Sequence, residues 1–127
     1  GQRFTVAVFG VEKAQSLAER WGGEGLAAVE RELAGRLCRK LPGVETLYHW
    51  EEGKLAAILS QPLHELAEQC VRLEAELGGT YSGAVNGKRT EFLVRVSSGA
   101  AEYIPGEPAG QLMERVSSAL GRALVPR

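Results

Sequence analysis

Residues 46–60 read TLYHWEEGKLAAILS, two runs of strand-forming residues on either side of the tetrapeptide EEGK. Strand-prone runs joined by a short turn that contains glycine are typical of a β-hairpin. Side chains alternate along a strand, so His49 should face away from the rings of Tyr48 and Trp50. We therefore predict a hairpin in the middle of the chain, with EEGK at its tip.

The residues before this hairpin form one apolar run and two helical patterns. Residues 4–11, FTVAVFGV, are continuously apolar, as expected for a strand that is covered on both faces. Apolar residues recur at helical spacing over 14–21, where the pair Gly22-Gly23 follows, and again over 26–41. We predict a central strand followed by two helices.

The residues after the hairpin predict a helix, a strand and a last helix. Residues 63–77 have an amphipathic helical pattern. The pair Asn86-Gly87 is a strong hairpin-turn signal and leads into TEFLVRVSSGAA, residues 90–101, which we predict to be one strand of the core sheet. The last helix should begin near Pro108 and bury Leu112, Val116, Ala119, Leu120 and Ala123.

The predicted order is strand, helix, helix, strand, strand, helix, strand, helix. Strands separated by helices, with one hairpin between them, favour a mixed sheet flanked by helices over a sandwich or a bundle. A ferredoxin-like α/β (α+β) fold with about five strands satisfies this order with short connections. The 127 residues are enough for one such domain.

The composition excludes several classes of partner. The net charge is -1 and acidic and basic residues are interleaved, so no electrostatic footprint for nucleic acid or an anionic membrane is present. The longest apolar run is far shorter than the roughly 20 residues that a membrane span needs. We expect a cytoplasmic domain without membrane insertion.

Cysteine usage and the last four residues add two expectations. Cys38 and Cys70 fall on apolar faces of predicted helices, without metal-ligand spacing, and are predicted to be buried free thiols in a reducing compartment. Residues 124–127 read LVPR, the sequence that thrombin leaves behind when it cuts a tag linker. We expect residues 1–123 to be a single domain excised from a longer protein.

The order and lengths of these segments resemble the GGDEF domain of bacterial diguanylate cyclases over residues 3–123. The clearest stretch, residues 85–123, looks like the family's strand, SxG turn, Ala-rich linker and terminal ADxALYxAK helix. The residues that match are Ser97, Gly99, Ala100, Ala119 and Leu120. The resemblance implies a nucleotide-cyclase-type sheet, a place in cyclic di-GMP signalling, and a signature loop on the EEGK turn.

The signature residues of the family are absent from that turn. Family enzymes have RxGGDEF there, because two glycines admit GTP and the following acid holds a metal ion that activates the 3′-hydroxyl. The five positions here are Glu51, Glu52, Gly53, Lys54 and Leu55. Two carboxylates in the glycine places should repel a triphosphate.

The resemblance places the remaining nucleotide contacts on unsuitable residues as well. The second metal ligand, an Asp at the end of the first strand, falls on Phe9, which cannot ligate Mg²⁺. The base-recognising Asn and Asp fall near Ala18 and Leu26. In the inhibitory RxxD motif the arginine falls on Pro42 and the acid on Glu45. We therefore expect no cyclase activity, no metal and no cofactor.

Three functions follow from these residues. The first is a catalytically inactive regulatory domain that acts by contact with a protein partner, a neighbouring domain or a second copy in a homodimer. The second is a receptor that binds cyclic di-GMP or GTP without turnover, for which Arg20, Arg39 and Lys40 are the basic candidates. The third is an unrelated ferredoxin-like interaction domain.

His49 and Trp50, which precede the two glutamates of the turn, suggest a contact with a ligand or a partner. Histidine next to carboxylates is also found in metal and catalytic clusters. Because His49 and Trp50 should lie on opposite faces of the strand, a solvated hairpin tip explains them more simply.

Overall fold

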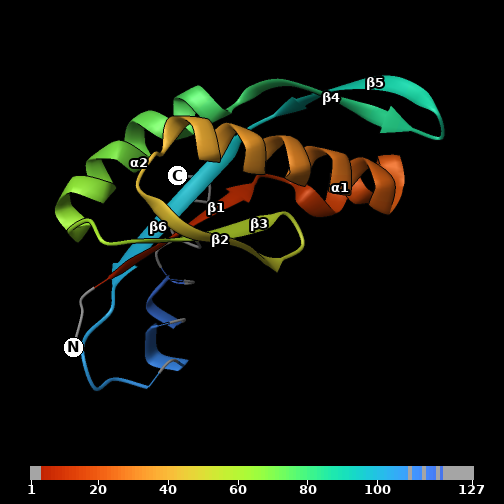
Figure 1. Ribbon diagram of the computed structural model, residues 1–127. Helices are drawn as coiled ribbons and strands as arrows, with labels where there is room; N and C mark the ends of the chain where they lie inside the picture. Colours follow the sequence, from red (N-terminus) through yellow and green to blue (C-terminus); the bar gives the residue numbers. More distant parts are fainter. Residues whose placement is uncertain (1–3, 109, 113, 117, 119–127) are drawn as a thin grey trace.

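The computed structural model describes residues 4–108, 110–112, 114–116 and 118 (Figure 1). Its elements in chain order are β1 (Thr5–Val11), α1 (Ala14–Lys40), β2 (Val44–Glu51), β3 (Lys54–Leu59), α2 (Leu63–Leu77), β4 (Gly79–Val85), β5 (Lys88–Val94) and β6 (Val96–Glu102). The described residues from 110 to 118 are helical. No helix among the described residues is long and apolar enough to cross a membrane.

Four of the strands form one antiparallel sheet in the order β2-β3-β1-β6. The predicted central strand and the predicted hairpin are both confirmed, since β1 lies between β3 and β6, and β2 pairs with β3. All seven residues of β1 are buried. This agrees with a continuously apolar strand that is covered on both faces.

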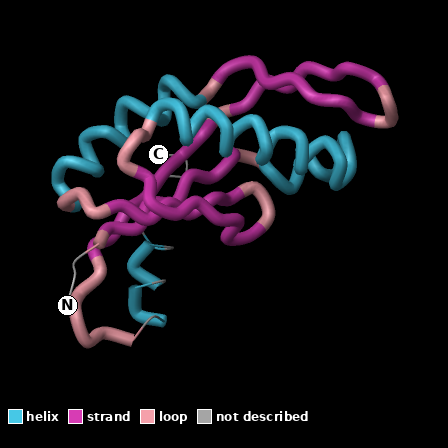
Figure 2. The backbone as a smooth tube through the Cα atoms, in the orientation of Figure 1, coloured by secondary structure: helices cyan, strands magenta, loops and turns pink. Residues whose placement is uncertain are grey.

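The sheet separates two apolar clusters. Helices α1 and α2 lie on one face, and the helical residues near the C-terminus lie on the other (Figures 1 and 2). Ala7, Phe9 and Val11 join the larger cluster, whereas Val6 and Val8 pack in the smaller one. The alternation of β1 therefore divides the core between the two faces. The predicted burial of Leu112 and Val116 is confirmed in the smaller cluster, and Ala119, Leu120, Ala123 and residues 124–127 lie outside the described residues.

The two helices predicted before the hairpin lie within the range of α1 and meet at a kink. Within α1, Gly22 has φ 76° and ψ 179°, a conformation that is open to glycine and not to residues with a Cβ. The predicted break at Gly22 is confirmed. The predicted division into two helices is confirmed as well, and the two segments join at this kink without a loop.

The predicted strand over 90–101 is wrong in its extent. It is divided near Arg95 into β5, which pairs with β4 in a separate two-stranded sheet, and β6, which belongs to the main sheet. Figure 2 shows this hairpin extending away from the main sheet. The Asn86-Gly87 turn is confirmed, with φ of 53° and 78° at its two residues.

Strand β4 was missing from the prediction, so the chain has six described strands where about five were expected. Its sequence, GTYSGAV, contains two glycines, which weaken the strand pattern. Packing against α1 explains the glycine at position 83, because a Cβ there would lie 2.5 Å from the Cβ of Ala28. The glycine that obscures the strand therefore lets it approach α1.

The cysteines differ from the prediction in one case. Both are free thiols, but Cys70 is buried and Cys38 is exposed. Leu33 and Leu37 belong to the buried stripe of α1, and Cys38 follows Leu37 by about 100° of helical rotation, which turns it to solvent. Burial raises the pKa of the Cys70 thiol to about 11, partly offset by a hydrogen bond with Ser98.

Candidate functional site

The hairpin tip on which the resemblance places the signature turn is tied to α1 by one carboxylate. Oε2 of Glu30 accepts a hydrogen bond of 2.7 Å from the backbone N–H of Gly53 and lies 2.9 Å from Nε2 of His49. The side chain of Glu30 is 16% exposed. On the other side, the N–H of Val11 donates to the carbonyl of Gly53 at 2.8 Å. The tip is therefore held by both α1 and β1.

Gly53 also packs closely against the first turn of α1. It has φ +75°, and a Cβ at this position would lie 2.4 Å from the Cβ of Ala14. Of the other signature positions, Leu55 is buried and both Glu51 and Glu52 are exposed. Lys54 pairs with Glu51 at 3.0 Å. The turn thus has solvated carboxylates around a glycine that has no room for a side chain.

The two positions where the resemblance implies metal ligands do not fit a metal ion. Phe9 is wholly buried in the apolar core, with Leu55 and Ser98 as its partners on the adjacent strands. Gly53 has no side chain to donate an oxygen. Within the described part of the chain, no group of three or more His, Cys, Asp or Glu side chains converges in a way that could hold a metal.

His49 and Trp50 lie on opposite faces of β2, as the alternation predicted. His49 pairs with Glu30 on the α1 side, and Trp50 packs against the smaller apolar cluster. The sequence pattern missed Glu30, because positions 30 and 49 are brought together only by the packing of α1 against the hairpin. The pair is structural support for the tip.

The three basic residues proposed as nucleotide contacts do not come together. Arg20 lies near the beginning of α1, with its guanidinium 5.2 Å from the centre of the Trp21 ring. Arg39 and Lys40 are at the far end of the helical segment that follows the Gly22 kink, about 24 Å from the start of that segment at 1.5 Å per residue. Nζ of Lys40 lies 3.7 Å from the carboxylate of Glu76. Of the inhibitory-site positions, Pro42 is exposed and Glu45 lies in β2.

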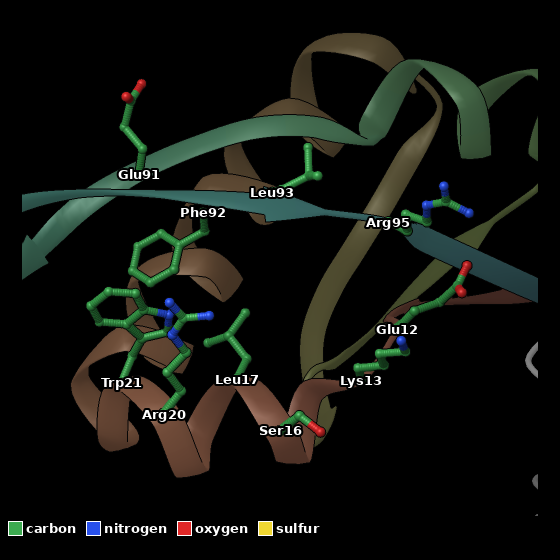
Figure 3. A pocket seen from close by; sticks show the side chains of 10 residues that line it. All are labelled: Glu12, Lys13, Ser16, Leu17, Arg20, Trp21, Glu91, Phe92, Leu93 and Arg95. Atoms are coloured by element: carbon green, nitrogen blue, oxygen red, sulfur yellow. The ribbon is translucent and has the colours of Figure 1, made fainter.

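An open groove of about 690 Å³ lies between the first part of α1 and β5 (Figure 3). Leu17 and Trp21 line it from the helix, and Phe92 lines it from the strand. The rings of Trp21 and Phe92 meet edge to face, with centroids 5.5 Å apart. Arg20 belongs to this groove, which the sequence did not predict because β5 was placed in the core sheet.

Comparison with known proteins finds similarity only at the level of structure. No family model and no curated protein matches the chain. The GGDEF domain of FimX from Pseudomonas aeruginosa is similar to it with a TM-score of 0.79 and 18% identity, over 97% of this chain and 75% of that one. The active GGEEF domain of a diguanylate cyclase from Vibrio cholerae gives 0.74 and 10%, over 96% and 76%.

A third structure is the diguanylate cyclase SiaD of Pseudomonas aeruginosa, in complex with its activator SiaC. It is similar with a TM-score of 0.78 and 22% identity, over 97% of this chain. The chain spans only 46% of SiaD. The likeness in fold extends over nearly the whole chain. The chain has the fold of the GGDEF domains of diguanylate cyclases.

Proposed function

We propose that this chain is a GGDEF-type regulatory domain that does not convert GTP to cyclic di-GMP and acts through contact with another protein or a neighbouring domain. The observation that supports it most directly is the position of Gly53. Where the family has a metal-binding acid, this chain has a glycine packed on Ala14 and hydrogen-bonded to Glu30. An acidic side chain there would need α1 to move.

Charge at the same turn supports the loss of turnover. Glu51 and Glu52 stand in the glycine places, and Glu30 lies directly beneath the tip. One lysine at position 54 is already paired with Glu51. A triphosphate brought to this turn would meet carboxylates without a metal ion to neutralise them.

Action through protein contact is supported by surface composition and by a relative. Four large apolar side chains are exposed among the described residues, and two of them strongly, Val71 at 72% and Leu93 at 85%. The structurally similar cyclase SiaD was solved with a protein activator bound. The proposal places this domain in cytoplasmic cyclic di-GMP signalling, as a module that receives or transmits a signal by contact.

The test is a product assay with a matched active domain. The purified chain is incubated with GTP and either Mg²⁺ or Mn²⁺, and cyclic di-GMP is measured by mass spectrometry. The active GGEEF domain from Vibrio cholerae serves as the positive control. We expect product from the control alone. Cyclase activity that co-elutes with this chain in gel filtration, seen as cyclic di-GMP that accumulates with time, would refute the proposal.

Binding of GTP or cyclic di-GMP without turnover is the competing function, and the geometry gives it less support. Arg20 lies far from Arg39 and Lys40 along α1, so the three side chains cannot bind one nucleotide together. We expect calorimetric titration with either nucleotide to show no binding up to millimolar concentration. A saturable signal with either one would favour the receptor function.

A further inference from the structure

The groove between α1 and β5 follows the free edge of a strand. In the two-stranded sheet, β5 is hydrogen-bonded to β4 along one edge only. Three consecutive residues, Glu91, Phe92 and Leu93, line the groove. Side chains of consecutive strand residues point to opposite faces, so a cavity that touches all three must run along the strand edge.

The register shows which backbone groups point into this edge. The Asn86-Gly87 turn joins Val85 and Lys88, and in a two-residue hairpin these flanking residues form a hydrogen-bonded pair. The pairing then alternates, so Glu91 opposite Ser82 and Leu93 opposite Thr80 are in non-hydrogen-bonded positions. Their N–H and C=O groups therefore face away from β4 and are available to another strand.

The floor of the groove is apolar. Phe92 points towards α1, where its ring meets Trp21, and Leu17 lies one helical turn before that tryptophan (Figure 3). Glu91 and Leu93 point the opposite way, away from the helix. An added strand would thus have one apolar side chain of every two directed onto Leu17 and Trp21.

The rim of the groove is basic. Lys13, Arg20 and Arg95 line it, and none of the three forms a salt bridge with any residue that the structure describes. Two acids are also present, but Glu12 accepts a hydrogen bond from Ser97 at 2.9 Å, and the carboxylate of Glu91 points away from α1. Three cations without a carboxylate partner favour an acidic ligand.

We propose that the β5 edge binds an extended acidic segment of a partner protein by strand addition. The main chain of the segment bonds to Glu91 and Leu93, an apolar side chain rests on Leu17 and Trp21, and its acidic side chains reach the basic rim. The acidic segment is the kind of partner that the contact function proposed above would use. The regulatory role of this binding rests on that proposed function, whereas the binding itself does not. A small anionic ligand and a second copy of this chain are the alternatives that the test separates.

The probe is a fluorescein-labelled nine-residue peptide that alternates aspartate with valine, measured by fluorescence anisotropy. We expect saturable binding to the unmodified chain. The double variant Arg20→Glu/Arg95→Glu should bind at least about tenfold more weakly, since each reversal places like charge beside the peptide. The control is Arg39→Glu/Arg72→Glu, which makes the same change in net charge at exposed sites elsewhere and should bind within about twofold of the original.

Main-chain pairing has its own readout. On adding the peptide, the amides of Glu91 and Leu93 should become protected from hydrogen exchange, whereas the amide of Phe92, already bonded to β4, should change little. A peptide of the same length with proline at its centre should lose most of its affinity, because proline has no N–H to donate.

Several results would overturn the strand-addition proposal. These are absence of peptide binding, equal weakening in both double variants, or full affinity of the proline peptide. Binding of GTP or cyclic di-GMP in place of the peptide, lost in Arg20→Glu/Arg95→Glu, would assign the groove to a small molecule. Dimers in sedimentation velocity that the peptide does not dissociate would assign it to a second copy. Cyclase turnover would remove the proposed function and leave these measurements unaffected.

Discussion

At the scale of single residues, Glu30 decides the position of the hairpin tip. One carboxylate oxygen meets both a backbone N–H and an imidazole nitrogen, in a site where the side chain is 16% exposed. Hydrogen bonds to a charged acceptor contribute about 1.5–3 kcal/mol each. The sequence could not predict this contact, since no local pattern connects position 30 with positions 49 and 53.

Glu30→Gln should lower the free energy of unfolding by about 1–2 kcal/mol, because the amide oxygen accepts more weakly than the carboxylate. The measurement is urea denaturation. Glu19→Gln is the matched control, an exposed position on the same helix, and should change stability by less than about 0.5 kcal/mol. Equal stability of Glu30→Gln and the unmodified chain would show that the contact contributes nothing.

Cys70 makes stability depend on alkaline pH. The folded state raises its pKa from 9.0 to about 11, chiefly by burial, so between these values the folded chain keeps a proton that the unfolded chain has lost. The stabilisation is complete below pH 9 and is lost as pH rises towards 11, by at most about 3 kcal/mol.

The measurement compares the unmodified chain with Cys70→Ala in urea titrations from pH 7 to 11. The loss between pH 9 and 11 should be smaller in the variant. Burial also raises the pKa of Tyr81. Because both proteins contain this tyrosine, its contribution cancels when their pH profiles are compared. Parallel pH profiles would contradict the account.

At pH 8, a thiol reagent should modify the exposed Cys38 rapidly and Cys70 only on unfolding.

At the scale of elements, the hairpin packs on the beginning of α1, so its tip has no room for a side chain at position 53. Gly53 permits this approach through its positive φ and its contact with Ala14. The sequence predicted the hairpin correctly, from its strand-prone runs and its glycine. It did not predict that α1 would lie against the tip, because interhelical and helix-to-turn contacts leave no periodic signal.

Gly53→Ala should destabilise the chain by about 2 kcal/mol or more, since alanine at φ +75° is strained and its Cβ would collide with Ala14. Gly23→Ala is the matched control within α1, where an added Cβ meets nothing within 4 Å, and should be neutral or stabilising by up to about 1 kcal/mol. Thermal denaturation of both variants measures the difference. Similar midpoints would exclude the close approach described here.

At the scale of the whole molecule, the sheet and its covering helices were predictable and the second sheet was not. The apolar run of β1, the amphipathic pattern of α2 and the central hairpin are strong periodic signals, and all three are confirmed. Strand β4 was hidden by its glycines, and the division of 90–101 depends on how β5 and β6 pair with different strands. The groove follows from that division, so Arg20 alone among its residues was predicted from the sequence to contact a ligand or partner.

The chain has the fold of GGDEF domains, and the proposed loss of turnover rests on the residues Glu51, Glu52 and Gly53 at the hairpin tip. The measurement that tests this most directly is cyclic di-GMP formation from GTP at high protein concentration with Mn²⁺, over hours, beside the active Vibrio cholerae domain. The account predicts no product above a protein-free blank. Product that increases in proportion to the concentration of this chain would contradict it.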